Sequence, residues 1–190
     1  MRLFCADIRG LDPAHARLPG RTAAPGSAFA WSLLGYAARE LWGAQILPAV
    51  GTRPGGAPFF PERPEWCFSL SHTRTHVLCA VSDSPVGADA EFRRERLPEH
   101  AEKLATAEEL ESFDFWELWT LRESFFKLTG RGSLRRSRFS RGEGGIIAPE
   151  PGVICRLYRD VPGCAAAVCA FSPELPERVE FVTGRAILNS

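Results

Sequence analysis

The sequence lacks an excess of charge of either sign, an apolar run of membrane length and a secretory leader. It has 23 Lys and Arg against 23 Asp and Glu, so its formal net charge is zero. A protein without net charge has no general attraction to nucleic acid or to a membrane surface. No apolar run approaches the roughly 20 residues that cross a bilayer, and residues 1–7 contain no apolar leader core. The sequence therefore predicts a cytoplasmic protein that binds neither partner, and we expect a monomer.

Cysteines paired for metal binding are also missing. The six cysteines form no C-x-x-C pair and have no His partner at zinc-ligand spacing. Several occur in apolar, strand-like runs, where a free thiol behaves as a small hydrophobic group. We expect reduced, buried thiols at Cys5, Cys67, Cys79, Cys155, Cys164 and Cys169.

Hydrophobic residues make up 45% of the chain, which is sufficient for a folded core. Their spacing predicts an α+β fold in two halves, residues 1–86 and 87–190. Towards the end of the chain, strand-like runs bounded by Pro and Gly indicate a meander. Helices are predicted at 27–42, 98–105, 106–112 and 115–129, and strands at 2–8, on both sides of 71–73, and at 86–92, 153–158, 164–171 and 178–182.

The predicted strand 86–92 carries two carboxylates. Because side chains alternate between the faces of a strand, Asp89 and Glu91 project together, about 7 Å apart, opposite an apolar face. Two like charges this close favour a bound cation, and Mg²⁺ prefers carboxylate oxygens. The alternative is an ordinary strand with one solvated face.

The predicted helix 115–129 begins after Asp114, a good N-cap, and ends before Gly130. Most of its circumference is apolar. We expect its single polar arc to line a cleft, whereas the alternative is an exposed Glu-Lys pair at i, i+4. The polar arc holds Glu117, Thr120, Glu123, Ser124 and Lys127.

A third motif, F-S-L-S-H-T at 68–73, reads as strand and turn and offers hydroxyls and an imidazole to a phosphate. It is followed by V-G-A-D-A-E at 86–91 and W-T-L-R-E-S-F-F-K-L-T-G-R-G at 119–132. In this order the three motifs resemble the 4′-phosphopantetheinyl transferases of the two-halved surfactin-synthetase-activating (Sfp) type. The resemblance covers about a third of the chain, from Phe68 to Gly132.

The resemblance implies transfer of 4′-phosphopantetheine from coenzyme A to a serine of an apo acyl or peptidyl carrier protein, releasing 3′,5′-ADP. It implies two halves related by pseudo-twofold symmetry, with the active site in the cleft between them. Asp89, Glu91 and Glu123 would hold Mg²⁺, and Glu123 is also the candidate base for the serine proton. Lys127 and Arg122 would meet the coenzyme A phosphates, and Ser71 and His72 its 3′-phosphate or pyrophosphate. Arg122 lies about 100° around the helix from Glu123, so it would have to curl.

The sequence departs from the family pattern at two usually cationic positions, Ala57 and Trp31, for which Arg21 and Arg53 are possible replacements. A weakened coenzyme A or carrier-protein binding module therefore stays open, as does an unrelated magnesium-dependent phosphohydrolase. After the helix, a basic run is a candidate docking surface for an acidic carrier, the alternative being a merely solvated loop. The run contains Arg131, Arg135, Arg136, Arg138 and Arg141.

Overall fold

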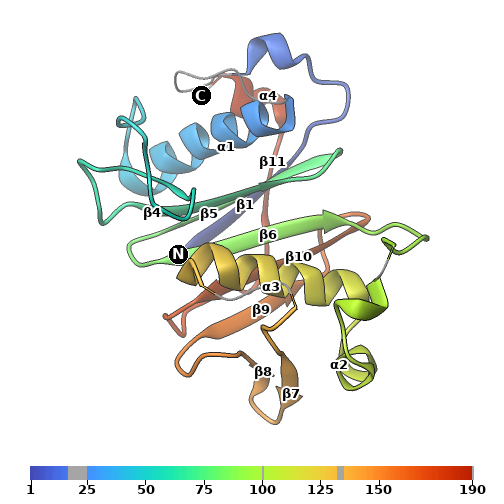
Figure 1. Ribbon diagram of the computed structural model, residues 1–190. Coiled ribbons are helices and arrows are strands. Elements are labelled where there is room, and N and C mark those ends of the chain that lie inside the picture. The colour runs from blue at the N-terminus through green and yellow to red at the C-terminus, as the bar shows by residue number, and fades with distance from the viewer. Residues whose placement is uncertain (17–24, 100, 132–134, 190) are drawn as a thin grey trace.

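A computed structural model describes residues 1–16, 25–99, 101–131 and 135–189. Two β-sheets form the centre, and one long helix lies against each (Figure 1). The mixture of helices and sheets confirms the α+β class. The first sheet has the order β11-β1-β5-β4, and the second β6-β10-β9. Their strands are β1 (Arg2–Asp7), β4 (Cys67–His72), β5 (His76–Ser82), β6 (Val86–Phe92), β9 (Ile154–Tyr158), β10 (Cys164–Ala170) and β11 (Glu180–Val182).

The hydrophobic clusters define four layers. Helix α1 (Pro25–Trp42) buries Leu33 and Leu34 against one face of the first sheet. The other face of that sheet packs directly on the second sheet, so one apolar layer joins the two halves. Helix α3 (Phe115–Thr129) buries Leu118 and Leu121 on the outer face of the second sheet. Each half thus has a sheet and a long helix, while a pseudo-twofold relation between them stays a prediction.

The expected meander is wrong in its last strand. Strands β9 and β10 pair antiparallel as predicted, but β11 leaves them and pairs parallel with β1. Two contacts hold the end of the chain against the first half. Glu180 accepts from Arg2 Nε at 2.8 Å, and Ile187 is fully buried in the first core. The expected second half, residues 87–190, therefore contributes its last strand to the first sheet and its last helix to the first core.

Most predicted helices are confirmed. Asp114 caps α3, and Gly130 ends it in the left-handed conformation, with φ 64°. Thr106 and Glu109 form the expected capping box of α2 (Ala107–Ser112). The predicted helix 98–105 contains only a short 3₁₀ turn, η2 (Ala101–Lys103). The remaining elements are η1 (Pro13–His15), β2 (Gly51–Thr52), β3 (Pro58–Phe59), β7 (Ser140–Gly142), β8 (Gly145–Ile147) and α4 (Gly184–Leu188).

The structure also bears on membrane crossing and on the state of the cysteines. In the described ranges, no helix combines the length and apolarity that a bilayer crossing requires. All six cysteines are free thiols, and all are buried except Cys67, which is half-buried.

Candidate functional site

The edges of the two sheets meet where β4 lies beside β6, and two serine side chains join them. Ser69 Oγ accepts from the Ala88 N–H at 2.8 Å. Two residues on, Ser71 Oγ accepts from the Ala90 N–H at 3.1 Å and donates to Asp89 Oδ1 at 2.8 Å. Ser71 is therefore buried in the junction, at the end of β4, and not in a turn as predicted. Its hydroxyl fixes one carboxylate of the predicted site.

A glycine in β6 sets the distance between this strand and helix α3. A Cβ on Gly87 would lie 1.9 Å from the Ser124 carbonyl oxygen and 2.6 Å from the Leu128 N, so no side chain fits there. The close approach is what brings the helix residues Glu123 and Lys127 to the β4–β6 junction.

Lys127 connects the two halves at this point. Its Nζ donates to the Leu70 carbonyl of β4 at 3.1 Å and to the Ala88 carbonyl of β6 at 3.1 Å. It also forms an ion pair with Asp89 Oδ1 at 2.7 Å. The ammonium group thus has three oxygen partners, two of them carbonyls.

The carboxylates around Lys127 have fewer donors than acceptor oxygens. Asp89 is 4% exposed, and its Oδ2 is buried without a hydrogen-bond partner. Burial, and then repulsion from Asp89, raise the pKa of Glu123 above its ordinary value, although Lys127 opposes the shift. The pKa of Glu91 is raised by burial and by the charge of Asp89, with a smaller contribution from Glu123. The charges of Asp89, Glu91 and Glu123 therefore influence one another, and the nearby positive groups do not fully offset them.

The predicted ligands do not form a ready-made coordination shell. Within the residues described, no group of three or more His, Cys, Asp or Glu side chains is arranged to hold a metal ion. A cation nevertheless fits the donor set, because the unpartnered Asp89 Oδ2 and the two carboxylates of raised pKa would each gain from added positive charge. Binding of one ion by Asp89, Glu91 and Glu123 stays a prediction.

The polar arc of α3 is divided between three environments, so the expectation that it lines a cleft is correct for Glu123 and Lys127 and wrong for Glu117, Thr120 and Ser124. Thr120 and Ser124 are fully buried, and Ser124 Oγ donates to the Ala167 carbonyl of β10 at 3.0 Å. Only Glu123 and Lys127 reach the junction between the halves, and both line a cavity there.

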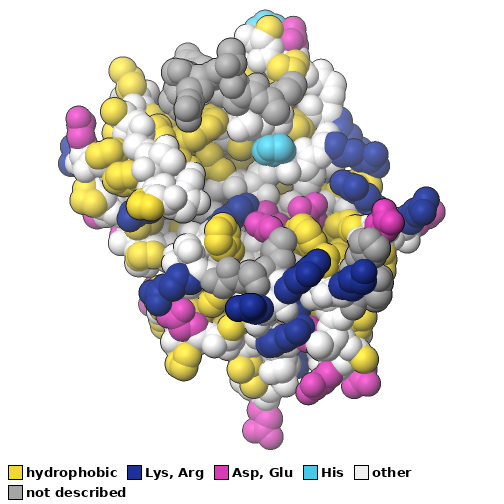
Figure 2. All heavy atoms as spheres, viewed as in Figure 1, with side chains coloured by type: hydrophobic (Ala, Val, Ile, Leu, Met, Phe, Trp, Pro, Cys, Tyr) yellow, Lys and Arg dark blue, Asp and Glu magenta, His cyan; other side chains and the backbone are white. Residues whose placement is uncertain are grey.

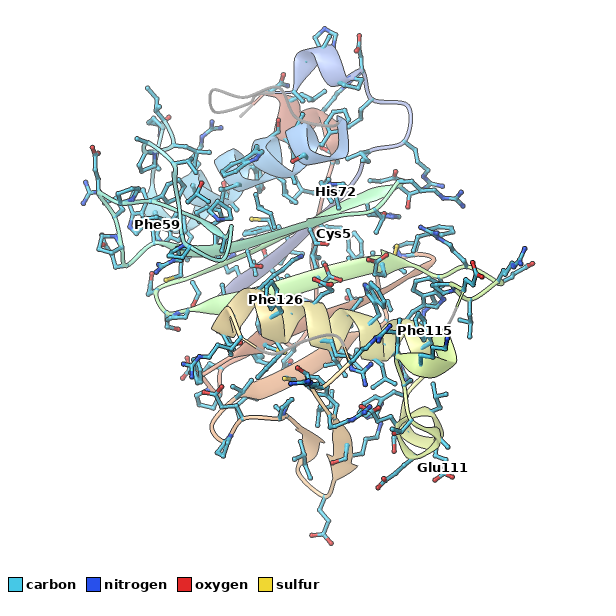
Figure 3. The ribbon with its side chains drawn as sticks, viewed as in Figure 1. Cys5, Phe59, His72, Glu111, Phe115 and Phe126 are labelled. Atoms are coloured by element: carbon cyan, nitrogen blue, oxygen red, sulfur yellow. The ribbon has the colours of Figure 1, made fainter. Side chains whose placement is uncertain are left out.

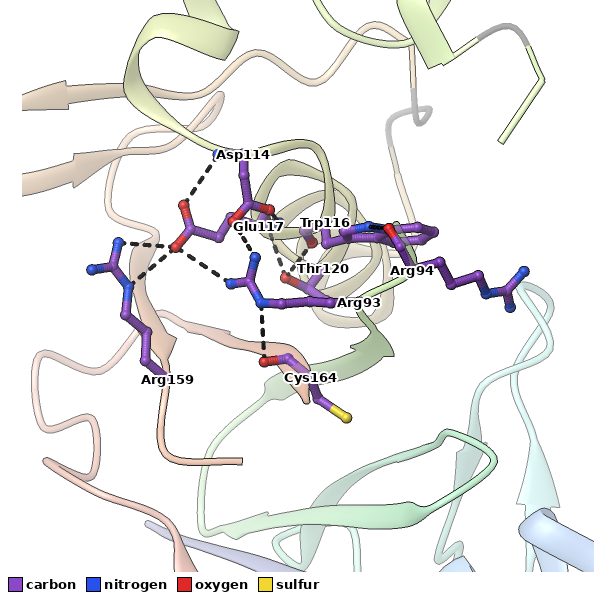
Figure 4. Close-up of polar contacts among 8 residues, drawn as sticks. All are labelled: Arg93, Arg94, Asp114, Trp116, Glu117, Thr120, Arg159 and Cys164. Atoms are coloured by element: carbon purple, nitrogen blue, oxygen red, sulfur yellow. Dashed lines mark hydrogen bonds and ion pairs between the residues drawn. The ribbon is translucent and has the colours of Figure 1, made fainter. Parts of the chain in front are cut away.

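Glu117, at the other end of the helix, lies in an ion network (Figure 4). Its Oε1 accepts from Arg159 Nη2 at 3.0 Å and lies 3.7 Å from Arg93 Nη2. Arg93 also pairs with Asp114, the N-cap residue, and donates from Nε to the Cys164 carbonyl at 3.3 Å. This network ties the beginning of α3 to the second sheet, and its carboxylates are compensated by arginines.

Arg122 is not brought to the predicted phosphate site. It is 3% exposed and points to the outer side of α3, where it donates to the Ser137 carbonyl at 2.9 Å and to Glu109 Oε1 at 2.7 Å. Its guanidinium also donates to the Leu104 carbonyl. The angular offset of Arg122 from Glu123 already indicated this orientation. Arg122 holds α2 and the segment 137–139 against α3.

Two cavities lie beside the acidic cluster, which is formed by Asp89, Glu91 and Glu123. The first, of about 500 Å³, lies between the halves and includes Glu123 and Lys127. Its walls are largely apolar and aromatic, with Phe59 on one half and Phe126 on the other (Figure 3). Ala57 lines it too, and Arg53 lies across the hairpin, its N–H donating to the Ala57 carbonyl at 2.9 Å. The Arg53 guanidinium lies 4.7 Å from the centre of the Phe59 ring.

The second cavity, of about 550 Å³, is more polar than the first and includes His72 and Glu91. Arg74 and Arg94 contribute two cations to its lining. Burial and the charge of Lys127 lower the pKa of His72. In Figure 2, a histidine, acidic side chains and basic side chains lie near the centre of the view, between the two halves. Glu123 lines the first cavity and Glu91 the second, so the acidic cluster lies between an apolar cavity and a more polar one.

The two positions that depart from the family pattern differ in role. Trp31 packs edge-on against Phe68, with ring centroids 5.9 Å apart, so it belongs to the first core. Ala57 faces the first cavity. Of the two proposed replacements, Arg53 borders that cavity, while Arg21 lies outside the described residues.

Sequence reasoning missed Gly87 and Ser69, which position the site, and Arg74 and Arg94, which line it. A glycine inside an otherwise apolar strand indicates close backbone approach. The alternation of Ser69 and Ser71 placed both hydroxyls on one face of β4. Nothing in the local sequence indicated the arginines, because they come from separate loops.

No family model matches the chain. Among curated proteins, it is similar to the 4′-phosphopantetheinyl transferase Sfp of Bacillus subtilis (strain 168), with 30% identity over 155 residues, which are 72% of this chain and 69% of that protein. It is 31% identical over 156 residues to the 4′-phosphopantetheinyl transferase psf-1 of Bacillus pumilus, covering 73% and 67% of the two chains. It is 35% identical over 75 residues to the 4′-phosphopantetheinyl transferase gsp of Aneurinibacillus migulanus, covering 34% and 32%. The chain therefore belongs to the Sfp-type 4′-phosphopantetheinyl transferases and is a transferase enzyme.

Proposed function

We propose that this enzyme transfers the 4′-phosphopantetheine group of coenzyme A to a serine of an apo acyl or peptidyl carrier protein. One observation carries the proposal: Asp89, Glu123 and Lys127 meet between two cavities, one largely apolar and one more polar, with two arginines in its lining. Such a junction suits a diphosphate whose two substituents extend to opposite sides. The carrier serine Oγ attacks the phosphorus that bears pantetheine, and the bond from that phosphorus to the nucleotide breaks, releasing 3′,5′-ADP.

The residues of the chain divide the work of this step. Glu123, which lines the first cavity beside Lys127, accepts the serine proton. Lys127, already between the halves, is placed to balance charge that develops on the phosphate oxygens. Arg74 and Arg94 provide positive charge for the remaining phosphates, and the His72 imidazole lies in the same cavity lining.

We propose Mg²⁺ as the cation of the acidic cluster, held by Asp89, Glu91 and Glu123. The buried Asp89 Oδ2, which has no partner, supports this assignment. When bound, Mg²⁺ supplies charge neutralisation and a template for the diphosphate oxygens. The hydrogen bond from Ser71 leaves Oδ2 as the free oxygen of Asp89.

The basic run after α3 is the proposed surface for an acidic carrier, although only part of it is available. Arg138 pairs with Glu109 at 2.8 Å, and Arg141 donates to the Ser112 carbonyl at 3.0 Å. Arg131 and Arg135 are exposed, and they are the better candidates for contact with carrier carboxylates.

Family membership removes the alternative of an unrelated phosphohydrolase. A binding module with little transfer activity remains the second candidate, because Ala57 leaves the first cavity without a cation that the family usually has there. Arg53, bordering the same cavity as Ala57, favours the active enzyme.

A direct test incubates the protein with an apo carrier, coenzyme A and Mg²⁺ and follows the carrier by intact-mass spectrometry. We expect the carrier to gain one phosphopantetheine group and 3′,5′-ADP to appear in equal amount. A carrier with alanine at the acceptor serine is the control, and a chelator tests the metal. Coenzyme A binding without any mass gain would establish the binding module instead.

A further inference from the structure

We propose that Cys155 and Cys169 form a dithiol–disulfide pair, a site at which a small thiol oxidant joins strands β9 and β10 covalently. The two sulfur atoms are 2.8 Å apart. A disulfide bond is about 2.05 Å long, so closing it needs a movement of less than about 1 Å. This inference is independent of the phosphopantetheinyl transfer.

The strand register places the two residues opposite each other. Cys155 pairs with Cys169 in the antiparallel β9–β10 ladder. Directly opposed residues in such a ladder have Cα atoms about 4.5 or 5.5 Å apart, within the roughly 4.4–6.8 Å that a disulfide spans. The backbone therefore already has a geometry that accepts the bond.

The pair lies under the catalytic helix. Cys169 is fully buried, and its Sγ donates weakly to the Leu121 carbonyl of α3 at 3.8 Å. Cys155, on the edge strand of the sheet, is 8% exposed. Oxidant reaches the pair through the edge, so Cys155 reacts first and Cys169 completes the bond. Burial, with the neighbouring thiol, raises the pKa of Cys169, so we expect oxidation to be slow at neutral pH and faster at higher pH.

Diamide, an azo compound, is a suitable reagent because its N=N bond accepts both electrons that the two thiols lose. The Cys155 thiolate adds to one nitrogen of the N=N bond and forms an S–N bond. The Cys169 thiolate then attacks Cys155 Sγ, the S–N bond breaks and the S–S bond forms. Diamide leaves as the hydrazine, having gained two electrons and two protons from the thiols.

Peptide mapping of the full-length protein tests the proposal. After diamide treatment and alkylation under denaturing conditions, we expect the number of free thiols to fall by two from six. Trypsin should yield the fragment 142–156 linked to 160–178, and dithiothreitol should separate them. Because Cys164 shares the second fragment with Cys169, the link must persist in Cys164→Ser and disappear in Cys169→Ser. Cys155→Ala gives the same loss if the Cys169 variant does not fold.

A competing pair, Cys5 with Cys164, provides the contrast. Burial raises the pKa of Cys5 to about 12, and Cys164 adds to the shift, so these thiols are near each other but on different sheets. Cys79→Ser removes an equally buried thiol of β5 and should leave the 142–156 to 160–178 link unchanged. Six free thiols after prolonged treatment, or a link that requires Cys5, would overturn the proposal.

Discussion

Buried carboxylates lie on both sides of helix α3, and the two sides differ in the number of hydrogen-bond donors around each carboxylate. On the outer side, Glu109 accepts from Arg122, Arg138, the Thr106 hydroxyl and the N–H groups of Thr106 and Phe139. On the inner side, Asp89 has Ser71 and Lys127 on one oxygen and nothing on the other.

The pKa values follow the supply of donors. Burial alone would raise the pKa of Glu109, but the bonds from Thr106, Arg122 and Arg138 outweigh it and bring the value to about 2. For Glu91 and Glu123, burial and repulsion from Asp89 prevail, and their pKa values are raised. A carboxylate whose oxygens all have hydrogen-bond donors stabilises the fold, whereas carboxylates with few donors have oxygens left to bind a ligand. In a chain of zero net charge, the two groups of carboxylates thus differ in their local supply of donors.

Asp89→Asn should have the largest effect on transfer. The substitution removes the anionic partner of Lys127 and one proposed metal ligand, so we expect kcat/KM to fall by at least about 100-fold. Steady-state transfer to an apo carrier measures it, and the free energy of unfolding checks the fold. Glu111→Gln, an exposed acid of α2, is the control and should leave both unchanged. A Asp89→Asn enzyme within about threefold of the wild type would contradict the role of the cluster.

Glu109→Gln should act on stability instead. Without its charge, the buried Arg122 loses its ionic partner, and we expect the free energy of unfolding to fall by about 3 kcal/mol. Chemical denaturation measures the loss. Glu108→Gln, one residue away and exposed, should change stability by less than about 0.5 kcal/mol. If Glu109→Gln abolished transfer in protein that is still folded, the two carboxylate groups would not be separable.

Acidification should separate the same two groups. The pKa of Glu109 is depressed, so its stabilising contribution is complete above about 4.5 and is lost only as the pH falls towards about 2. The pKa values of Glu91 and Glu123 are raised, so these groups lose their charge at a higher pH than ordinary glutamates. We expect kcat/KM to decline before the melting temperature does. Parallel pH profiles of the two quantities test this, and coincident profiles would refute it.

Arg53→Ala should give the smallest change. An exposed cation at the cavity border contributes about 1 kcal/mol at most, so we expect KM for coenzyme A to rise roughly fivefold with little change in kcat. Arg63→Ala removes a comparable arginine, 5.2 Å from the centre of the Trp66 ring but outside the cavity lining, and should have no effect. Ala57→Lys in the Arg53→Ala background should restore the lower KM. Equal effects of the Arg53 and Arg63 substitutions would exclude a specific role for Arg53.

Local patterns in the sequence predicted the elements well. The caps Asp114 and Gly130 gave the bounds of α3, and alternation in 86–92 placed Asp89 opposite the apolar face of β6. Helix geometry also placed Arg122 away from Glu123. These features depend on neighbours in the chain, and their spacing is therefore visible in the sequence.

Features that depend on contacts between distant segments were harder to predict from the sequence. The return of β11 to β1 depends on the pairing of Glu180 with Arg2, 178 residues apart. The division of the polar arc depends on how closely β6 approaches α3, which buries Ser124 although it shares a helix face with Lys127. Such contacts are set by tertiary packing, which no local period encodes.

The missing side chain at Gly87 has a consequence for how this enzyme can be varied. The strand and the helix that supply the opposing members of the acid–lysine pair touch backbone to backbone at this point. Enlarging residue 87 would shift the helix and move Glu123 and Lys127 together. The activity of variants with a larger residue 87 would therefore report how rigidly these two side chains must be held.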